Sequence, residues 1–352
     1  MADGIENNLF LINAPAGSGK TTTIFKRIET LVRDENCTSV LCITYTRRAV
    51  EELQRKLEGY SVKIMTIHAF LAEFMKPYFG NPKIVQLYLK IYKNEIENQI
   101  LKDNKKREES KNWNKFIEKY GLLVYETDEK NIERIYYNER EFNGYYYGGL
   151  GHDGLLYFAL QVIKTYPIVG TKLTECYKHI FIDEYQDTNE IQENLILLIS
   201  RCHLPEINRF MVGDMKQSIY RFRKADLDIF NEKYLTYGLE DNNQRIDLKF
   251  NYRSNKIVLD SSNYIFNAIM DRRYGGLEYD NDPHAQLNYD FLRKEKCDTD
   301  EKLQKAMLRY DQEKRFDSEI MLVLKPEDET VDMIEYEAKM IGKKIHEMVG
   351  HL

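Results

Sequence analysis

Short apolar runs alternate with amphipathic segments along the first third of the chain. The expected strands there are LFLIN (9–13), SVLCITY (39–45) and VKIMTI (62–67). Each run is followed by a segment whose apolar residues recur at helical spacing, as in TRRAVEELQRKLEG (46–59). Strand and helix alternating at this spacing predict an α/β fold, with a parallel sheet covered by helices on both faces.

The same alternation returns after an interruption. Residues 80–150 are rich in Lys, Glu, Asn and Tyr and predict a mostly helical insertion, whose tyrosines either pack a thin subdomain or stack on bases. The later strands are expected at HIFI (179–182), RFMVGD (209–214) and IDLKF (246–250), with a loop or linker at 272–318. EIMLVL (319–324) and a helix over 332–349 have the pattern of another α/β unit that begins here.

Composition excludes several classes of protein. The chain has 352 residues, 31% of them charged, and a formal net charge of −6, so any nucleic acid must be gripped by a local groove rather than by a wholly basic surface. Its five cysteines lack a CxxC pair, which argues for reduced thiols in a cytoplasmic protein and against a zinc or iron–sulfur site. The acidic, polar N-terminus predicts no signal peptide, and no apolar run approaches the roughly 18 residues that a membrane helix needs.

The stretch APAGSGKT (14–21) has the form of a phosphate-binding P-loop between a strand and a helix. Gly17 and Gly19 let backbone N–H groups approach a phosphate that a Cβ would crowd. Lys20 is expected to reach the β and γ phosphates of ATP, and the Thr21 hydroxyl to bind Mg²⁺. The residues expected to hold the nucleotide are Ala14, Ala16, Gly17, Ser18, Gly19, Lys20, Thr21 and Thr22.

Acidic residues and a glutamine follow the apolar run HIFI in the stretch HIFIDEYQDTNE (179–190). Charges at the carboxyl end of a buried parallel strand lie where α/β sheets bind ligands, although an isolated acidic cluster is as typical of a solvated loop. With a P-loop on a neighbouring strand, Asp183 is expected to hold Mg²⁺ through water, and Glu184 to position the attacking water.

Six motifs occur in order between residue 9 and about residue 270: GSGKT, TYTRRAVEEL, TIHAF, DEYQDTN, GDMKQSIYRFRKAD and NYRS. They resemble those of the UvrD/Rep/PcrA-like superfamily-one DNA helicases, and the block from DEYQDTN to NYRS is most similar to the AddA and RecB helicase–nuclease branch. The resemblance implies a RecA-like P-loop sheet, a helical inserted subdomain and the start of a second RecA-like domain. The implied boundaries are 1–79 and 156–271 for the first RecA-like domain, 80–155 for the insertion, and 272–352 for a linker and the incomplete second domain.

The resemblance also implies roles around the nucleotide. Gln217 would sense the γ-phosphate, and Gln186 would link the nucleotide to the DNA-binding surface. Tyr252 would stack on adenine, and Arg253 would contact the γ-phosphate and stabilise charge during phosphoryl transfer, with an ordinary surface ion pair as its alternative. The expected catalytic residues are Lys20, Asp183, Glu184, Gln217 and Arg253.

The same motifs imply a track for single-stranded DNA. Tyr220 and Phe222 alternate in YRFR, so in an extended segment they face the same way and could stack on successive bases, with Arg223 beside them; buried core aromatics are the alternative. Residues of TYTRRA and TIHAF would line the same channel: Tyr45, Thr46, Arg47, Thr66, His68 and Phe70. Taken alone, His68 would more often be a packing residue than a ligand.

Two departures from the family pattern limit what this chain is expected to do. Only eight residues precede the P-loop strand, so the family's upstream adenine-reading glutamine is not matched, and adenine selectivity would rest on Tyr252. The second RecA-like domain is recognised only from about residue 319. We therefore expect a fragment of a longer enzyme, or a short relative, that binds ATP but hydrolyses it weakly.

Three functional hypotheses remain open on the sequence. The leading one is an ATP- and Mg²⁺-dependent DNA helicase of repair and recombination, moving 3′ to 5′ as its family does. Its expected partners are single-stranded DNA or 3′-tailed duplex and a nuclease, with no membrane association. A second is a nucleotide-gated DNA sensor that regulates a partner nuclease, similar to the short UvrD-like proteins of anti-phage systems such as Gabija. A third is a P-loop ATPase with no nucleic-acid role.

Overall fold

The computed structural model places much of the chain in one compact unit. The described residues are 9–33, 35, 37–98, 134–139, 143–145, 148–201, 207–218, 225–239, 243–271, 278, 279, 282, 284–290, 299, 302–305, 307, 339 and 341–343. The chain divides into two units, Met1–Asp290 and Phe291–Leu352, and the helices and strands discussed below belong to the first. The strand expected at 319–324 and most of the helix expected at 332–349 lie outside the described residues.

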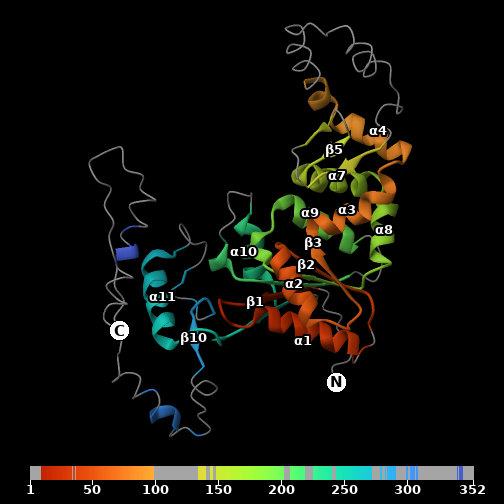
Figure 1. The fold of residues 1–352 in the computed structure, drawn as a ribbon. Helices are drawn as coiled ribbons and strands as arrows, with labels where there is room; N and C mark the ends of the chain where they lie inside the picture. The colour runs from red at the N-terminus through yellow and green to blue at the C-terminus, as the bar shows by residue number, and fades with distance from the viewer. Residues whose placement is uncertain are drawn as a thin grey trace, which may run out of the picture. The chain divides into compact units, whose positions relative to one another are not determined.

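A six-stranded parallel sheet forms the centre of the first unit, with the strand order β3-β2-β6-β7-β1-β8 (Figure 1). Its strands are β1 Leu9–Asn13, β2 Val40–Thr44, β3 Val62–Thr66, β6 His179–Ile182, β7 Asn208–Gly213 and β8 Asn243–Asp247. β1 lies between two partners, with Leu9 opposite Arg209 of β7 and opposite Asn243 of β8. The predicted parallel α/β sheet is confirmed.

Helices cover both faces of the sheet. On one face lie α1 Lys20–Arg33 and α2 Arg47–Lys56; on the other lie α3 Ile67–Met75, α7 His152–Thr165, α9 Glu190–Arg201 and α10 Leu227–Thr236. Because side chains alternate along a strand, Val40 and Cys42 of β2 pack with the first set, and Leu41 and Ile43 pack with the second. Strands buried on both faces leave only their ends open to a ligand.

The edge strand β8 differs from the strand expected at 246–250. The observed strand Asn243–Asp247 is polar and partly exposed, and Phe250–Asn251 forms a separate strand, β9, paired with β10 Asn288–Tyr289. A strand at the edge of a sheet pairs on one side only and tolerates polar residues, whereas a search for apolar runs selects central strands. The expected boundaries were wrong for that reason.

The described part of the insertion packs around tyrosines. It contains α4 Pro82–Ile91 and a short parallel pair, β4 Tyr136–Tyr137 and β5 Gly149–Leu150. Tyr92 stacks on Tyr145 with ring centroids 4.0 Å apart, and the Tyr92 hydroxyl donates a hydrogen bond to the Gly154 carbonyl. Tyr145 therefore packs the subdomain, while residues 99–133 lie outside the described part of the chain.

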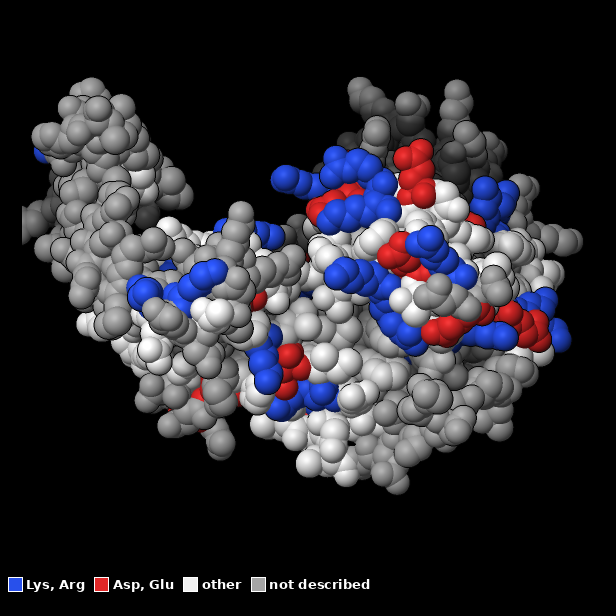
Figure 2. Space-filling view, turned by 90° about the horizontal axis from the view of Figure 1, so that it is seen from below, with Lys and Arg blue, Asp and Glu red and all other residues white. Residues whose placement is uncertain are grey.

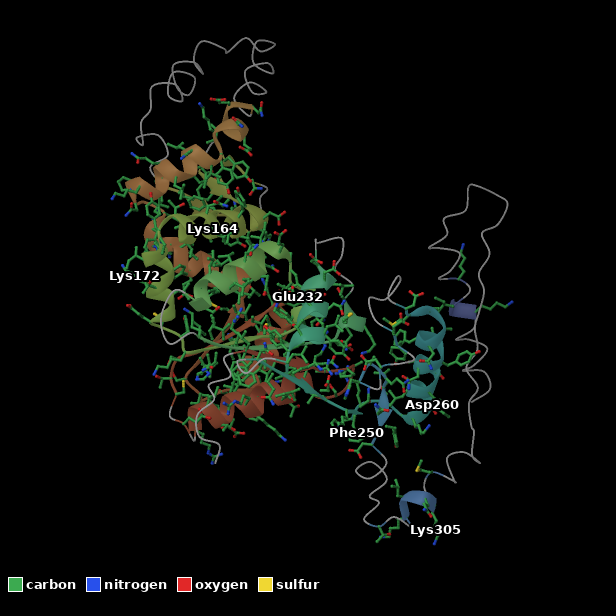
Figure 3. All side chains as sticks on the ribbon, turned by 180° about the vertical axis from the view of Figure 1, so that it is seen from behind. Lys164, Lys172, Glu232, Phe250, Asp260 and Lys305 are labelled. Carbon is green, nitrogen blue, oxygen red and sulfur yellow. The ribbon has the colours of Figure 1, made fainter. Side chains whose placement is uncertain are left out.

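Short turns and two further helices complete the path of the chain. The helices are α8 Pro167–Thr174 and α11 Lys256–Ile269, and the 3-10 turns are η1 Lys76–Tyr78, η4 Tyr185–Asp187 and η5 Met215–Gln217. Lys164 of α7 and Lys172 of α8 are exposed, and Asp260 of α11 pairs with Lys256 at 2.6 Å (Figure 3). Among the described helices, none has the length and apolar character needed to cross a membrane.

Candidate functional site

The P-loop joins β1 to α1 through a turn that requires glycine at two positions. Gly17 has φ +70° and Gly19 has φ +93°, a region that L-residues avoid. A Cβ on Gly17 would also lie 2.4 Å from Nδ2 of Asn251. The Ser18 hydroxyl is buried, and none of the described residues provides it with a hydrogen-bond partner. The turn therefore forms a cradle with an unsatisfied buried donor, which is typical of an anion site.

Lys20, the first residue of α1, is held by oxygens that follow two other strands. Its ammonium donates to Oε2 of Glu184 at 2.7 Å and to Oε1 of Gln217 at 2.9 Å. Glu184 follows β6, and Gln217 lies in η5 after β7. Three residues expected to act together, from distant parts of the sequence, therefore meet at one edge of the sheet.

Asp183 and Glu184 lie in different environments although they are adjacent. Asp183 is 4% exposed; burial, and then the charge of Glu184, raise the pKa of its carboxyl to about 6. Glu184 is partly exposed and has φ +50°, the single positive φ among the described non-glycine residues. That backbone conformation costs about 1–2 kcal/mol and persists where surrounding contacts hold it, here those of Lys20 and Gln186.

The strand order corrects the expectation that the acidic strand is a direct neighbour of the P-loop strand. β7 lies between β1 and β6. The contact between Lys20 and Glu184 survives this separation because Gln217, which follows β7, bonds the same ammonium. Ala14 is fully buried in the core, and its N–H donates to the carbonyl of Gly213 at the end of β7.

Asp214, directly after β7, was not among the expected site residues. Its carboxylate accepts hydrogen bonds from the Ala16 N–H at 3.1 Å and from Nε2 of Gln217 at 2.8 Å, and it pairs with Lys216 at 2.7 Å. An acidic residue directly after an apolar strand is the same signal that identified Asp183. Asp214 thus links the P-loop backbone to the glutamine that holds Lys20.

Gln186 is a buried connector rather than a group open to nucleotide. Its side chain belongs to a residue that is 1% exposed. Nε2 donates to Glu184 Oε2 at 2.9 Å, and Oε1 accepts from the Asp214 N–H at 3.0 Å. The amide therefore ties the end of β6 to the end of β7, which places it between the two carboxylates that organise the site.

Asn251 attaches the NYRS segment to the P-loop and was also missed. Its Nδ2 donates to the Ala16 carbonyl at 2.6 Å, and its Oδ1 accepts from the Arg253 N–H at 2.8 Å. The Tyr252 N–H donates to the Gly17 carbonyl at 2.8 Å. Tyr252 is 43% exposed, and Arg253 is exposed as well, so both expected nucleotide contacts lie beside the cradle.

The residues at this edge fit ATP with Mg²⁺. The cradle offers backbone N–H groups and the Ser18 hydroxyl, and Lys20 offers a cation that now bonds a carboxylate and an amide oxygen. Thr21, partly exposed on α1, and Asp183 offer the oxygen ligands that Mg²⁺ prefers. Thr22 is exposed.

A second site lies where β2, β3 and β6 end. A pocket of about 680 Å³ opens there. Five of the expected DNA contacts line it: Tyr45, Thr46, Arg47, Thr66 and His68. The hydroxyls of Thr46 and Thr66 also cap α2 and α3, and the Tyr45 hydroxyl lies 2.6 Å from that of Thr188. The lining residues that the motifs did not indicate include Glu139, His152, Asn189 and Gln192.

His68 and His152 face each other in this pocket, with ring centroids 4.5 Å apart. Burial, and then the proximity of His152, lower the pKa of His68 to about 4, so its ring is neutral at pH 7. The Tyr137 hydroxyl lies 3.0 Å from Nδ1 of His152. A neutral imidazole can stack on a base or exchange a hydrogen bond with it, but it cannot neutralise a phosphate.

Phe70 does not line the pocket, and the expectation that it contacts DNA is corrected. Phe70 is 3% exposed and packs against Phe74 and Tyr177 in the core, because its position on α3 faces inward. The expected stacking residues Tyr220 and Phe222, with Arg223, lie outside the described residues.

Charge near the pocket is mixed. Arg47, expected on the DNA backbone, pairs with Glu139 at 2.5 Å, and the two side chains are 75% and 48% exposed. On the face in Figure 2, Lys and Arg side chains likewise lie beside Asp and Glu side chains rather than forming one basic field. Any grip on a polyanion is therefore local, as the composition predicts.

Comparison with known proteins matches most of the first unit. The family model of the UvrD/REP helicase N-terminal domain matches residues 3–108 and 81–238. An ATP-dependent helicase/nuclease polypeptide of Clostridium perfringens (strain 13 / Type A) is 37% identical over 196 residues, which is 52% of this chain and 15% of that protein. A protein of the same name from Streptococcus pneumoniae D39 is 40% identical over 151 residues, 43% of this chain and 12% of that protein. The exonuclease/helicase protein RexA of S. pneumoniae TIGR4 has the same identity over the same length. The chain thus spans less than a fifth of the length of these relatives.

Proposed function

The chain belongs to the family of UvrD/REP helicase N-terminal domains, and from that premise we propose that it is the ATP-binding motor portion of a DNA helicase that moves along single-stranded DNA. The contact that carries the proposal is the one among Lys20, Glu184 and Gln217, which lies at the same edge of the sheet as the motif-lined pocket. A role in DNA repair beside a nuclease partner is part of the proposal, since the relatives are named as helicase/nuclease subunits.

Bound ATP and Mg²⁺ supply the transferable phosphoryl group and a charge that neutralises it. Lys20 exchanges its bond with Glu184 for phosphate oxygens. Glu184 is then released to hold the attacking water and accept its proton, while Gln217 stays beside the Lys20 ammonium. Asp183, together with Thr21, holds the metal, and Arg253 adds positive charge from the NYRS segment.

The nucleotide site and the pocket are connected through η4. Glu184 precedes this turn and Asp187 ends it, and Asp187 lines the pocket. Gln186, inside the turn, bonds both Glu184 and the Asp214 N–H. A change at Glu184 on nucleotide binding therefore moves a segment that lines the DNA pocket. Movement in the 3′ to 5′ direction rests on the family resemblance.

The first experiment is nucleotide binding by the 352-residue chain, followed with a fluorescent ATP analogue and Mg²⁺. Lys20→Ala removes charge-assisted bonds worth about 1.5–3 kcal/mol each, so affinity should fall about 10- to 100-fold. Lys26→Ala is the matched control, because Lys26 is an exposed lysine on the same helix. An equal loss in the two variants would contradict the proposed site.

The second experiment is ATP turnover with and without oligo(dT). Stimulation by the oligonucleotide supports a motor, and its absence contradicts one. A strand-displacement assay on 3′-tailed duplex then separates the hypotheses, since a DNA sensor binds the substrate without unwinding it.

A further inference from the structure

The described lining of the DNA pocket is acidic. It contains one guanidinium, that of Arg47, and the three carboxylates of Glu139, Asp153 and Asp187. His68 is neutral at pH 7, since burial and His152 lower its pKa to about 4. A strand of DNA that approaches this pocket therefore meets one fixed positive charge and several negative ones.

The one guanidinium of this described lining is already engaged. Nη2 of Arg47 lies 2.5 Å from Oε2 of Glu139, within the range of a charge-assisted hydrogen bond. The Arg47 side chain is 75% exposed and that of Glu139 is 48% exposed, so the pair lies at the rim of the pocket rather than in the core. A rim ion pair is in exchange with solvent and open to competition from another anion.

The pair joins two parts of the first unit that are far apart in sequence. Arg47 begins α2, directly after the capping residue Thr46, whereas Glu139 follows β4 in the insertion. Both side chains line the same pocket. Glu139 thus presents a carboxylate to the position on Arg47 that a DNA phosphate would need.

We propose that Glu139 acts as a competitor for the DNA backbone and is an affinity-determining residue of the pocket. Its carboxylate holds Arg47 in the free protein, and a phosphate of single-stranded DNA must displace it. The inference rests on the proposed function, because it requires that this pocket binds DNA. Glu139 thereby weakens the grip on each phosphate that passes, which suits a protein that must release DNA as readily as it binds it.

The test is fluorescence anisotropy of a labelled dT oligonucleotide with the 352-residue chain, over a range of salt concentrations. Glu139→Gln keeps the size of the side chain and removes its charge, and because exposed pairs are weak we expect DNA affinity to rise about two- to fivefold. The gain should shrink as salt rises, since salt screens the pair. Arg47→Gln should weaken binding and reduce the slope of log K against log salt by about 0.7.

Two controls make the result specific. Glu139→Gln in the Arg47→Gln background should have no effect, because its partner is gone. Glu52→Gln removes the same charge from α2, where Glu52 pairs with Lys56 at 2.8 Å and is not among the lining residues. An equal gain in Glu52→Gln, a gain that persists without Arg47, or no gain at all would overturn the inference.

Failure of the inference is distinguishable from failure of the proposed function. If the parent chain binds oligo(dT) and Arg47→Gln weakens it while Glu139→Gln changes nothing, only the competitor role falls. If the parent chain binds no oligonucleotide, the DNA-binding function and the inference that depends on it fall together. Circular dichroism of each variant establishes that it is folded.

Discussion

Gly17→Ala tests whether the P-loop and the NYRS segment are held together as one structural unit. The first cost is backbone strain, because Gly17 has φ +70°, where an L-residue costs about 1–2 kcal/mol. The second is a collision, since the new Cβ would lie 2.4 Å from Nδ2, 2.8 Å from Cγ and 2.9 Å from Oδ1 of Asn251. Asn251 is 3% exposed, so its side chain has little room to move away.

The displaced side chain would weaken three hydrogen bonds of 2.6–2.8 Å, one to the Ala16 carbonyl and two from the N–H groups of Arg253 and Ser254. At about 0.5–1.5 kcal/mol each, their loss adds about 1.5–4.5 kcal/mol. We therefore expect Gly17→Ala to lower the free energy of unfolding by about 2.5–6.5 kcal/mol. The measurement is urea unfolding followed by far-UV circular dichroism.

Gly59→Ala is the matched control. Gly59 has φ +87°, but none of the described residues places an atom within 4 Å of the position that a Cβ would take, so only the strain of about 1–2 kcal/mol applies. A double variant, Gly17→Ala with Asn251→Ala, removes the collision and should lose less than the two single variants together. If Gly17→Ala is no worse than Gly59→Ala, or if the double variant is strictly additive, the reasoning about Asn251 is refuted.

Two further predictions concern buried charges. Burial and Glu184 raise the pKa of Asp183 to about 6, so the folded state retains a proton that the unfolded chain loses from about pH 4, and stability falls as pH rises through 6. Asp183→Asn should therefore be about 2–3 kcal/mol more stable than the parent at pH 8, with no difference near pH 4, by urea unfolding without nucleotide; an equal gain at both pH values would contradict this. Lys216 and Asp214 form a pair at 2.7 Å with side chains 4% and 1% exposed. Lys216→Met should cost about 3–5 kcal/mol in the same assay, since it leaves a buried carboxylate without its cation, and a loss below about 1 kcal/mol would show that the pair is dispensable.

The sequence predicted the central strands and the P-loop because both depend on local patterns. An apolar run marks a strand buried on two faces, and glycine at positions 17 and 19 reflects a backbone conformation that few other residues adopt. The polar edge strand β8 carries no such signal. The contact of Lys20 with Glu184 and Gln217 followed from motifs, since the strand order that produces it depends on how the whole sheet assembles.

The residues that sequence reasoning missed act through partners that are distant along the chain. Asn251 matters because Ala16 lies against it, and Glu139 because Arg47 does. Phe70 shows the opposite error, since it belongs to a motif whose other members line the pocket, yet its place on α3 turns it into the core. Motif membership indicates a neighbourhood, whereas the helical face decides what a side chain touches.

The pairing of β1 with β8 limits where the protein can pivot. β1 leads into the P-loop and β8 leads toward the NYRS segment, and the two strands are joined along their length from Leu9–Asn243 to Asn13–Asp247. Asn251 and the Tyr252 N–H then fasten that segment to the loop itself. Relative rotation of these two parts would break a full ladder, so a hinge that opens the nucleotide cleft must lie farther along the chain than Tyr252.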